Sequence, residues 1–215
     1  MNRSISRPAL IVASGEDVPK EPPALNDGNT LVICANGGAK LARLWNLTPG
    51  LILGDQDSLD ASSKEYWLAK GIPLQSVSAV KDETDLDLAV QYALNQGADS
   101  LTLVGGWGSR IDHSLGNVEL LYRLALLGIP NQLLTRDHRL SAVCRGYKTQ
   151  VRQGSIVSLL PLSPEVSGLT TSGLLYALEK VTIRKGSTLT ISNVATATDI
   201  SVEMANGVLL IIMEQ

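Results

Sequence analysis

Two aspartates two residues apart follow a short apolar run in the segment Gly54–Ser58, which reads Gly-Asp-Gln-Asp-Ser. Carboxylate oxygens are the ligands that a hard cation such as Mg²⁺ prefers, and a tight loop can present Asp55 and Asp57 to one ion. For an isolated motif of this kind, a solvent-exposed acidic turn with a helix cap is the simpler interpretation. The position of this motif directly after the apolar run Leu51–Leu53, which we interpret as a strand, favours a metal site instead.

A second pair of aspartates lies in Lys81–Asp85, at the start of a segment whose apolar residues recur with helical spacing. Asp82 and Asp85 are three residues apart, so we expect them to share one helix face and to lie at the edge of a sheet. Asp82 is also a suitable N-cap, and acidic residues stabilise the first turn of a helix. Capping alone would therefore explain Asp82, and capping is compatible with metal binding.

Two further polar segments contain glycine and also follow apolar runs. Ala35–Lys40 includes Gly37 and Gly38, which let the backbone turn tightly and approach a ligand, although a glycine pair at a strand end is more often a plain turn. Gly105–Asn117 reads GGWGSRIDHSLGN and places three glycines before a helix that we expect to begin near Asp112. Free backbone N–H groups at the start of a helix can hold phosphate, so this segment is a candidate phosphate loop.

Polar side chains in the last of these segments suit a nucleotide. Arg110 can bind phosphate oxygens with its planar guanidinium, and His113 and Asn117, four residues apart, share one helix face. The alternative is a helix start capped by Asp112 with a structural histidine. The segment has neither the Walker pattern nor the G-x-G-x-x-G of dinucleotide folds. The acids, the glycines and the arginine together predict an Mg²⁺-dependent enzyme acting on a nucleotide or a diphosphate.

Short apolar strands alternate with helical patterns through the first half of the chain, where all of these polar segments lie. Such alternation predicts a Rossmann-like parallel sheet with helices on its faces, and the loops that follow its strands share one edge. The expected strands are Leu10–Ala13, Leu31–Cys34, Leu51–Leu53, Ser76–Val80, Leu101–Val104 and Gln132–Thr135, and the expected helices are Ala39–Trp45, Ser62–Lys70, Asp85–Asn95 and Ser114–Leu127.

The pattern changes from about Leu140, where short apolar runs are separated by glycine and asparagine and no long helical pattern remains. This half predicts an antiparallel β-sandwich. We place the boundary within Leu140–Gln150 and expect an α/β domain over residues 1–143 and a smaller all-β domain over residues 144–215. The expected strands of the second domain are Ser155–Leu160, Lys180–Ile183, Thr188–Ile191, Ile200–Met204 and Gly207–Met213.

Composition and charge exclude several classes of protein. The net charge of −3 gives no electrostatic reason to expect nucleic acid or an acidic membrane as a partner. Cys34 and Cys144 alone do not make a disulfide framework, which fits a reduced compartment. No apolar run is long enough for a signal peptide core or a membrane span. We therefore expect a cytoplasmic protein.

In their order along the chain, the polar segments resemble the thiamine pyrophosphokinase family. That family carries A-D-G-G, G-D-x-D-S, D-x-T-D and a run similar to G-G-x-x-G-R-x-D-H, followed by S-L-x-P, G-L-aromatic and a Ser-Asn pair. The chain has the matching segments Gly54–Ser58, Asp82–Asp85, Gly105–His113, Ser158–Pro161 (SLLP), Gly173–Tyr176 (GLLY) and Ser192–Asn193. Each motif is weak alone, but six in order across both domains are specific.

The resemblance implies an enzyme that transfers diphosphate from ATP to the hydroxyl of thiamine, giving thiamine diphosphate and AMP. It implies a homodimer with active sites between subunits, an ATP- and Mg²⁺-binding catalytic domain, and a thiamine-binding sandwich. It also implies magnesium ligands Asp55, Asp57 and Asp85; a catalytic set completed by Asp82 and Arg110; a nucleotide side of Arg110, Asp112, His113, Asn117, Asn36 and Gly37; and a thiamine side of Tyr176, Ser192, Asn193 and Thr84.

On the thiamine side, the resemblance gives Tyr176 a stacking role and gives Ser192 and Asn193 contacts with the aminopyrimidine. An ordinary sandwich aromatic and a hairpin turn are the structural alternatives. The chain departs from the family at Asn36, where the family has aspartate, so one acid near the metals is missing. Two other functions stay open: a pyrophosphokinase for another hydroxymethyl heterocycle such as a pterin, and a non-catalytic thiamine-binding protein. Asn36 favours the binder, whereas the remaining acids argue against it.

Overall fold

The computed structural model describes residues 6–25, 28–54, 59–76 and 82–215. Two compact units are distinguishable: Met1–Asn117 with Leu134–Arg136, and Val118–Leu133 with Asp137–Gln215. We call them the first and the second unit. This division by compactness does not test the predicted boundary between two functional domains, which stays a prediction. Among the described residues, no helix combines the length and the apolar character needed to cross a bilayer.

The first unit contains a parallel sheet in the order β4-β3-β2-β1-β5. The strands β1, β2 and β3 are apolar and almost wholly buried, as expected of parallel strands with helices on both faces, whereas β4 has the exposed residues Gln75 and Ser76. The register aligns Leu10 of β1 with Val32 of β2 and with Thr102 of β5. The strands are β1 (Pro8–Val12), β2 (Leu31–Ala35), β3 (Leu51–Gly54), β4 (Leu74–Ser76) and β5 (Ser100–Val104).

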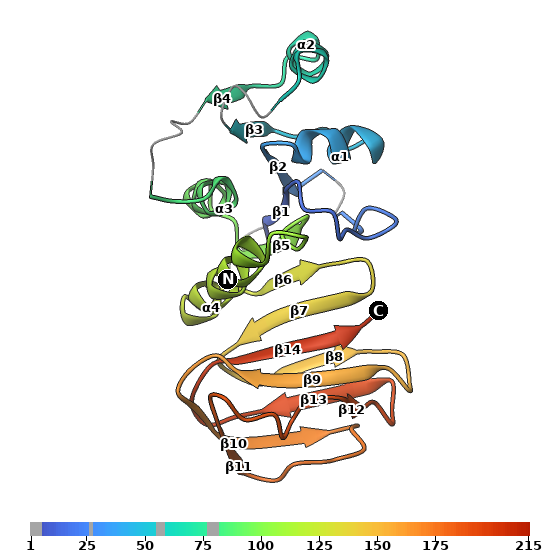
Figure 1. Ribbon diagram of the computed structural model, residues 1–215, viewed down its shortest axis with the longest axis vertical. Coiled ribbons are helices and arrows are strands. Elements are labelled where there is room, and N and C mark those ends of the chain that lie inside the picture. The colour runs from blue at the N-terminus through green and yellow to red at the C-terminus, as the bar shows by residue number, and fades with distance from the viewer. Residues whose placement is uncertain (1–5, 26–27, 55–58, 77–81) are drawn as a thin grey trace, which may run out of the picture. The chain divides into compact units, whose positions relative to one another are not determined.

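The helices of the chain are α1 (Gly38–Leu44), α2 (Ala61–Ala69), α3 (Asp85–Asn95) and α4 (Ile111–Leu126), and α4 crosses from the first unit into the second. Helices α1 and α3 both contact β1 and β2, from opposite faces of the sheet (Figure 1). Gly38 allows the close approach of α1, because a Cβ there would overlap the carbonyl oxygen of Val12. The first residue of α1 must therefore be glycine for the helix to lie this close to β1.

Helix α3 begins at the predicted residue, but its N-cap is Thr84 and not Asp82. The Thr84 backbone is extended, and its Oγ1 accepts a hydrogen bond of 3.2 Å from the backbone N–H of Asp87. Asp82 precedes the helix, so the expectation that Asp82 and Asp85 share one helix face was wrong. Threonine and aspartate are both good caps, so residue type alone does not decide which of the two caps the helix.

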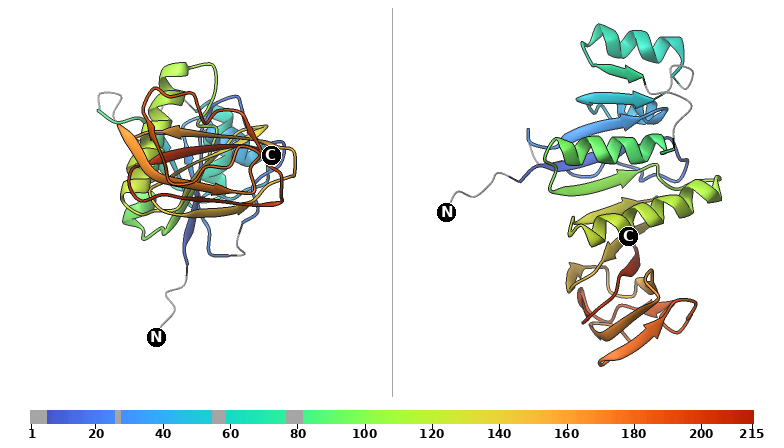
Figure 2. Two further views of the ribbon diagram at one scale, coloured as in Figure 1. Left: turned by 90° about the horizontal axis from the view of Figure 1, so that it is seen from below. Right: turned by 90° about the vertical axis from the view of Figure 1, so that its left-hand side faces the viewer.

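The second unit is an antiparallel β-sandwich, as predicted. One layer is formed by strands in the order β12-β9-β14-β7-β6, and the other layer is a sheet in the order β11-β10-β13-β8. The strands lie in two layers (Figure 2). The apolar faces of the layers enclose one core, to which Val157, Leu159 and Ile211 contribute from the first layer and Val166 and Val202 from the second. The strands are β6 (Asn131–Leu134), β7 (His138–Val143), β8 (Tyr147–Gln150), β9 (Ile156–Pro161), β10 (Glu165–Ser172), β11 (Val181–Arg184), β12 (Asn193–Val194), β13 (Asp199–Glu203) and β14 (Leu209–Glu214).

One expected strand of the sandwich was wrong. Thr188–Ile191 forms a turn, in which the Thr190 hydroxyl donates to the carbonyl oxygen of Leu159 at 2.5 Å. The backbone N–H of Leu159 donates to the carbonyl oxygen of Thr190 at 2.9 Å. The apolar side chain of Leu189 is exposed there, so its hydropathy was misleading. Of the expected strand Ser76–Val80, residues 77–80 lie outside the described residues, and β4 ends at Ser76.

Candidate functional site

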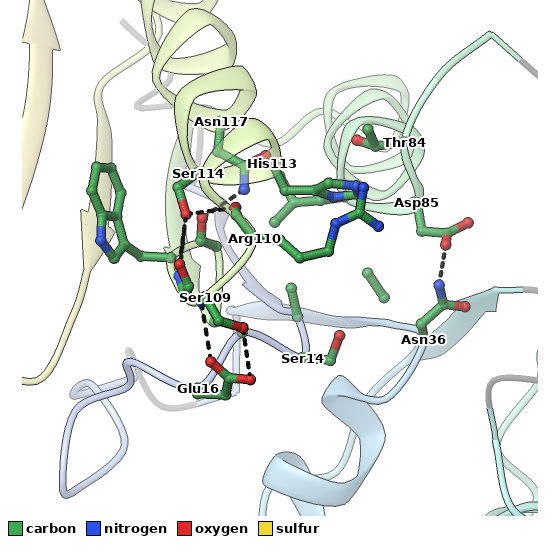
Figure 3. Close-up of a pocket in the computed structure, with 18 of the residues that line it drawn as sticks. Ser14, Glu16, Asn36, Thr84, Asp85, Ser109, Arg110, His113, Ser114 and Asn117 are labelled. Carbon is green, nitrogen blue, oxygen red and sulfur yellow. Dashed lines mark hydrogen bonds between the residues drawn. The ribbon is translucent and has the colours of Figure 1, made fainter.

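A cavity of about 690 Å³ lies in the first unit, where parallel strands end (Figure 3). The segments after β1, β2 and β5 meet there with the start of α3 and the start of α4. This convergence follows from the parallel order, because the carboxyl ends of such strands share one edge. The lining residues are Ala13–Glu16, Ala35, Asn36, Asp82–Leu86, Gly105–Arg110, His113, Ser114 and Asn117.

The segment after β1, Ser14–Asp17, was missed by the sequence analysis and is bonded to the glycine loop after β5. The Glu16 carboxylate accepts from the backbone N–H of Ser109 at 3.1 Å and from its hydroxyl at 3.0 Å. The N–H of Gly15 donates to the carbonyl oxygen of Gly105 at 2.8 Å. Ser14–Asp17 is a polar segment that directly follows an apolar strand. The same pattern identified the other candidate segments.

The start of α4 holds the glycine loop from the other side. The Asn117 amide donates to the carbonyl oxygen of Gly106 at 2.6 Å, and the Ser114 hydroxyl accepts from the N–H of Gly108 at 3.2 Å. Both side chains are buried, and Ser114 was missed although it lies on the same helix face as Asn117. The N–H groups of Gly108 and Ser109 are therefore engaged within the protein. The prediction that N–H groups at the start of α4 hold phosphate concerns later residues and stays a prediction.

Arg110 extends from the start of α4 toward the start of α3 (Figure 3). Its guanidinium donates to the Asp112 carboxylate at 2.6 and 3.3 Å, and both side chains are largely exposed, at 69% and 66%. These hydrogen bonds raise the pKa of Arg110 and lower the pKa of Asp112. An exposed pair of this kind contributes little free energy, so the guanidinium can exchange its partner for a ligand anion. Asp112 itself is not among the lining residues.

Asn36 and Asp85 lie against each other at the opposite side of the pocket. The Asn36 side-chain amide donates to the Asp85 carboxylate (Figure 3). Asp82 is exposed and also lines the pocket, as Thr84 does, whereas Gly37 does not.

The predicted metal ligands Asp55 and Asp57 lie outside the described residues. Within the described part of the chain, no three His, Cys, Asp or Glu side chains are grouped as a metal site. The lining residues nevertheless include four carboxylates, those of Glu16, Asp82, Glu83 and Asp85.

The predicted thiamine-side residues of the sandwich lie together in the second unit. The Asn193 side chain accepts from the backbone N–H of Tyr176 at 3.0 Å and donates to its carbonyl oxygen at 2.9 Å. The Tyr176 side chain is 67% exposed, whereas Asn193 is buried. Ser192 adopts a left-handed backbone with φ of 59°, and its N–H donates to the hydroxyl of Ser158 at 2.9 Å. Ser158 belongs to the SLLP segment, so three of the predicted motifs converge here.

The fold and the site define a class of protein in which an α/β unit with an acidic, glycine-lined pocket is followed by an antiparallel sandwich. Residues 23–131 match the family model of the thiamin pyrophosphokinase catalytic domain. Residues 147–209 match that of the thiamin pyrophosphokinase vitamin B1 binding domain. The chain belongs to the thiamin pyrophosphokinase family, which confirms the resemblance seen in the motifs.

Individual relatives resemble the chain over nearly its whole length. A thiamine pyrophosphokinase of Bacillus subtilis (strain 168) is 31% identical over 206 residues, which cover 94% of this chain and 96% of the relative. Thiamine pyrophosphokinase 1 of Arabidopsis thaliana is 28% identical over 230 residues, covering 95% and 85%. A crystal structure of thiamine pyrophosphokinase from Bacillus subtilis superposes with a TM-score of 0.89 at 28% identity, covering 97% of this chain and 99% of that one.

Proposed function

We propose that this chain is an ATP-dependent diphosphotransferase that converts thiamine and ATP to thiamine diphosphate and AMP. The observation that carries the proposal is the pocket at the strand ends, which lies within the region that matches the catalytic domain of the family and contains Arg110. In this reaction the thiamine hydroxyl oxygen forms a bond to the β-phosphorus of ATP. The bond from that phosphorus to the oxygen that bridges the α- and β-phosphates breaks, AMP leaves with that oxygen, and the hydroxyl proton is released to solvent.

The nucleotide is proposed to lie at the carboxyl edge of the parallel sheet, as in Rossmann-like folds. Arg110 binds phosphate oxygens and stabilises the charge that develops on them during transfer. Asn117 and Ser114 keep the glycine loop in place through their bonds to Gly106 and Gly108. His113 and Asp112, at the same helix start, stay predicted nucleotide-side residues.

The side chains of the pocket fit Mg²⁺, because they offer oxygen donors and an excess of carboxylates over guanidinium. We propose Asp85 as a ligand, and Asp82 belongs to the same pocket lining. Asp55 and Asp57 follow Gly54 of β3 directly in the sequence and stay predicted ligands. When bound, the ion would neutralise phosphate charge and orient the triphosphate.

On the thiamine side, the exposed ring of Tyr176 is suited to stacking on an aromatic heterocycle. Asn193 holds the Tyr176 backbone through two hydrogen bonds and so sets the position from which the ring projects. Contacts of Ser192 and Asn193 with the aminopyrimidine, and of Thr84 with the substrate, stay predictions.

One assay tests the function against both alternatives. Purified protein with ATP and Mg²⁺ should release AMP and form thiamine diphosphate in equal amounts when thiamine is added. A hydroxymethyl pterin in place of thiamine should give no AMP above the rate without acceptor. AMP release with the pterin alone would favour the rival pyrophosphokinase. Thiamine binding by calorimetry with no AMP or thiamine diphosphate formed would favour the binding protein.

We also propose that the active form is a homodimer whose sites combine residues of both chains. The candidate residues divide between the two units, and Leu175, next to Tyr176, is exposed, as are Leu189 and Ile191, shortly before Ser192. Exposed apolar side chains in such numbers are typical of a surface that binds protein or ligand.

Subunit mixing tests this arrangement. A chain with Asp85→Asn and a chain with Ser192→Ala and Asn193→Ala should each be inactive. After exchange, the mixture should recover about a quarter of wild-type activity, because half of the dimers are mixed and each mixed dimer restores one of its two sites. A lack of recovery despite subunit exchange confirmed by mass spectrometry would assign both halves of the site to one chain.

A further inference from the structure

Asn36 lies where the end of β2, the end of β3 and the start of α3 come together. Its backbone N–H donates to the carbonyl oxygen of Leu53 at 2.7 Å, and its carbonyl oxygen accepts from Ala39 at 3.3 Å. The backbone is left-handed, with φ of 47°, a conformation that asparagine tolerates better than most residues. Backbone hydrogen bonds to both neighbouring elements therefore hold Asn36 in place. Its side chain consequently points in a defined direction.

The side chain of Asn36 lies between Gly54 and Asp85. A Cβ at Gly54 would overlap the Asn36 Oδ1 atom, so glycine provides the space that the amide occupies. On the other side, the Asn36 Nδ2 group donates to the Asp85 carboxylate. An ionised carboxylate can only accept hydrogen bonds, which makes the nitrogen the atom that faces Asp85. Asn36 thus connects the strand ends to the first residue of α3.

The Asn36 amide is a neutral donor in a pocket whose lining is rich in carboxylates. The described lining residues include four carboxylates and the guanidinium of Arg110. An aspartate at position 36 would place a fifth carboxylate directly against Asp85, and two like charges in contact destabilise the folded state unless a cation lies between them. The amide of Asn36 contacts the Asp85 carboxylate without that requirement.

We propose that Asn36 is a positioning residue that keeps the Asp85 carboxylate at the pocket edge when no divalent cation is bound. The fold around Asp85 is then independent of the metal, whereas an aspartate at position 36 would make it depend on the metal. The positioning role depends only on the hydrogen bond between Asn36 and Asp85. The metal dependence rests on the Mg²⁺ site of the proposed function.

Thermal unfolding in EDTA at neutral pH tests the hydrogen bond without substrate or metal. Asn36→Asp should lower Tm by about 2–4 °C relative to wild type, the shift expected of a modest repulsion in a chain of this size. The matched control is Asn46→Asp, because Asn46 is exposed and also left-handed, with φ of 53°. It should change Tm little. Asn36→Ala, which removes the donor without adding charge, should lower Tm by more than Asn46→Ala, which carries the same cost of alanine in a left-handed backbone.

Exchange of the partners gives the decisive variant. The double substitution Asn36→Asp with Asp85→Asn again pairs one amide with one carboxylate. Its Tm in EDTA should be higher than the sum of the two single shifts predicts, which is the signature of direct coupling. Strictly additive shifts, or an Asn36→Asp shift no larger than that of Asn46→Asp, would overturn the positioning role. The coupling is measured on folded protein without turnover, so it can hold even if the diphosphotransferase assay fails.

Addition of Mg²⁺ alone tests the metal dependence. Mg²⁺ should raise the Tm of Asn36→Asp by more than that of wild type, because a ligand that binds the folded state more tightly stabilises it more. Calorimetry should show tighter Mg²⁺ binding by Asn36→Asp. The active variant should then need less Mg²⁺ for half-maximal activity than wild type. Equal Mg²⁺ responses of wild type and Asn36→Asp would overturn the metal dependence, and a wild type inactive until Asn36→Asp is introduced would favour the thiamine-binding protein.

Discussion

Asp85→Asn should reduce turnover by roughly a hundredfold or more, because a lost metal ligand removes several kcal/mol of transition-state stabilisation. The fold should survive. Asparagine has the shape of aspartate, and its side-chain oxygen can still accept a hydrogen bond from the Asn36 amide. The N-cap Thr84 and the buried stripe of α3 are unchanged by the substitution. A severe loss of turnover in a folded Asp85→Asn protein would therefore show that turnover depends on the negative charge of Asp85.

The measurement is kcat from AMP release, with circular dichroism and Tm as checks on folding. Asp87→Asn is the matched control, because Asp87 lies in the same helical turn and accepts from Gln91 at 3.0 Å but does not line the pocket. Its turnover should stay close to that of wild type. We expect the same severe loss for Asp55→Asn and Asp57→Asn. Full activity in any of the three variants would remove that residue from the metal site.

Arg110→Ala should lower kcat by about a hundredfold to a thousandfold and leave the KM for thiamine nearly unchanged. An arginine that contacts a transferring phosphoryl group acts mainly in the transition state, so its loss appears in turnover more than in binding of the acceptor. Loss of the exposed pair with Asp112 should cost little stability.

Steady-state kinetics with each substrate varied in turn separate these effects. Arg110→Lys keeps the charge but not the planar fork, so its kcat should lie between those of wild type and Arg110→Ala. Arg152→Ala, which removes an exposed arginine of the second unit, is the control for a general change in charge. An Arg110→Ala protein with normal kcat and weakened thiamine affinity would contradict the phosphate role.

Much of the architecture could be predicted because its signals are local. The first unit has alternating buried strands and helices, and the second has short strands. Both patterns appear as periodicity in the sequence, since burial repeats with the geometry of each element. Helix α3, for example, begins and ends at the residues that the periodicity predicted. Local signals failed where two neighbours compete, as Thr84 and Asp82 do for the cap, and where an apolar residue is exposed, as Leu189 is.

The sequence by itself determined the order of the motifs, the residue types available for metal and phosphate, and the two kinds of sheet. Only the tertiary structure decided which of those residues touch. Glu16 and Ser109 are 93 residues apart, and Asn36 and Asp85 are 49 apart, so no local pattern predicts either pair. Both contacts form because parallel strands end at one edge of a sheet. Whether a side chain there meets a donor, a carboxylate or a glycine depends on strand order and register, which long-range packing sets.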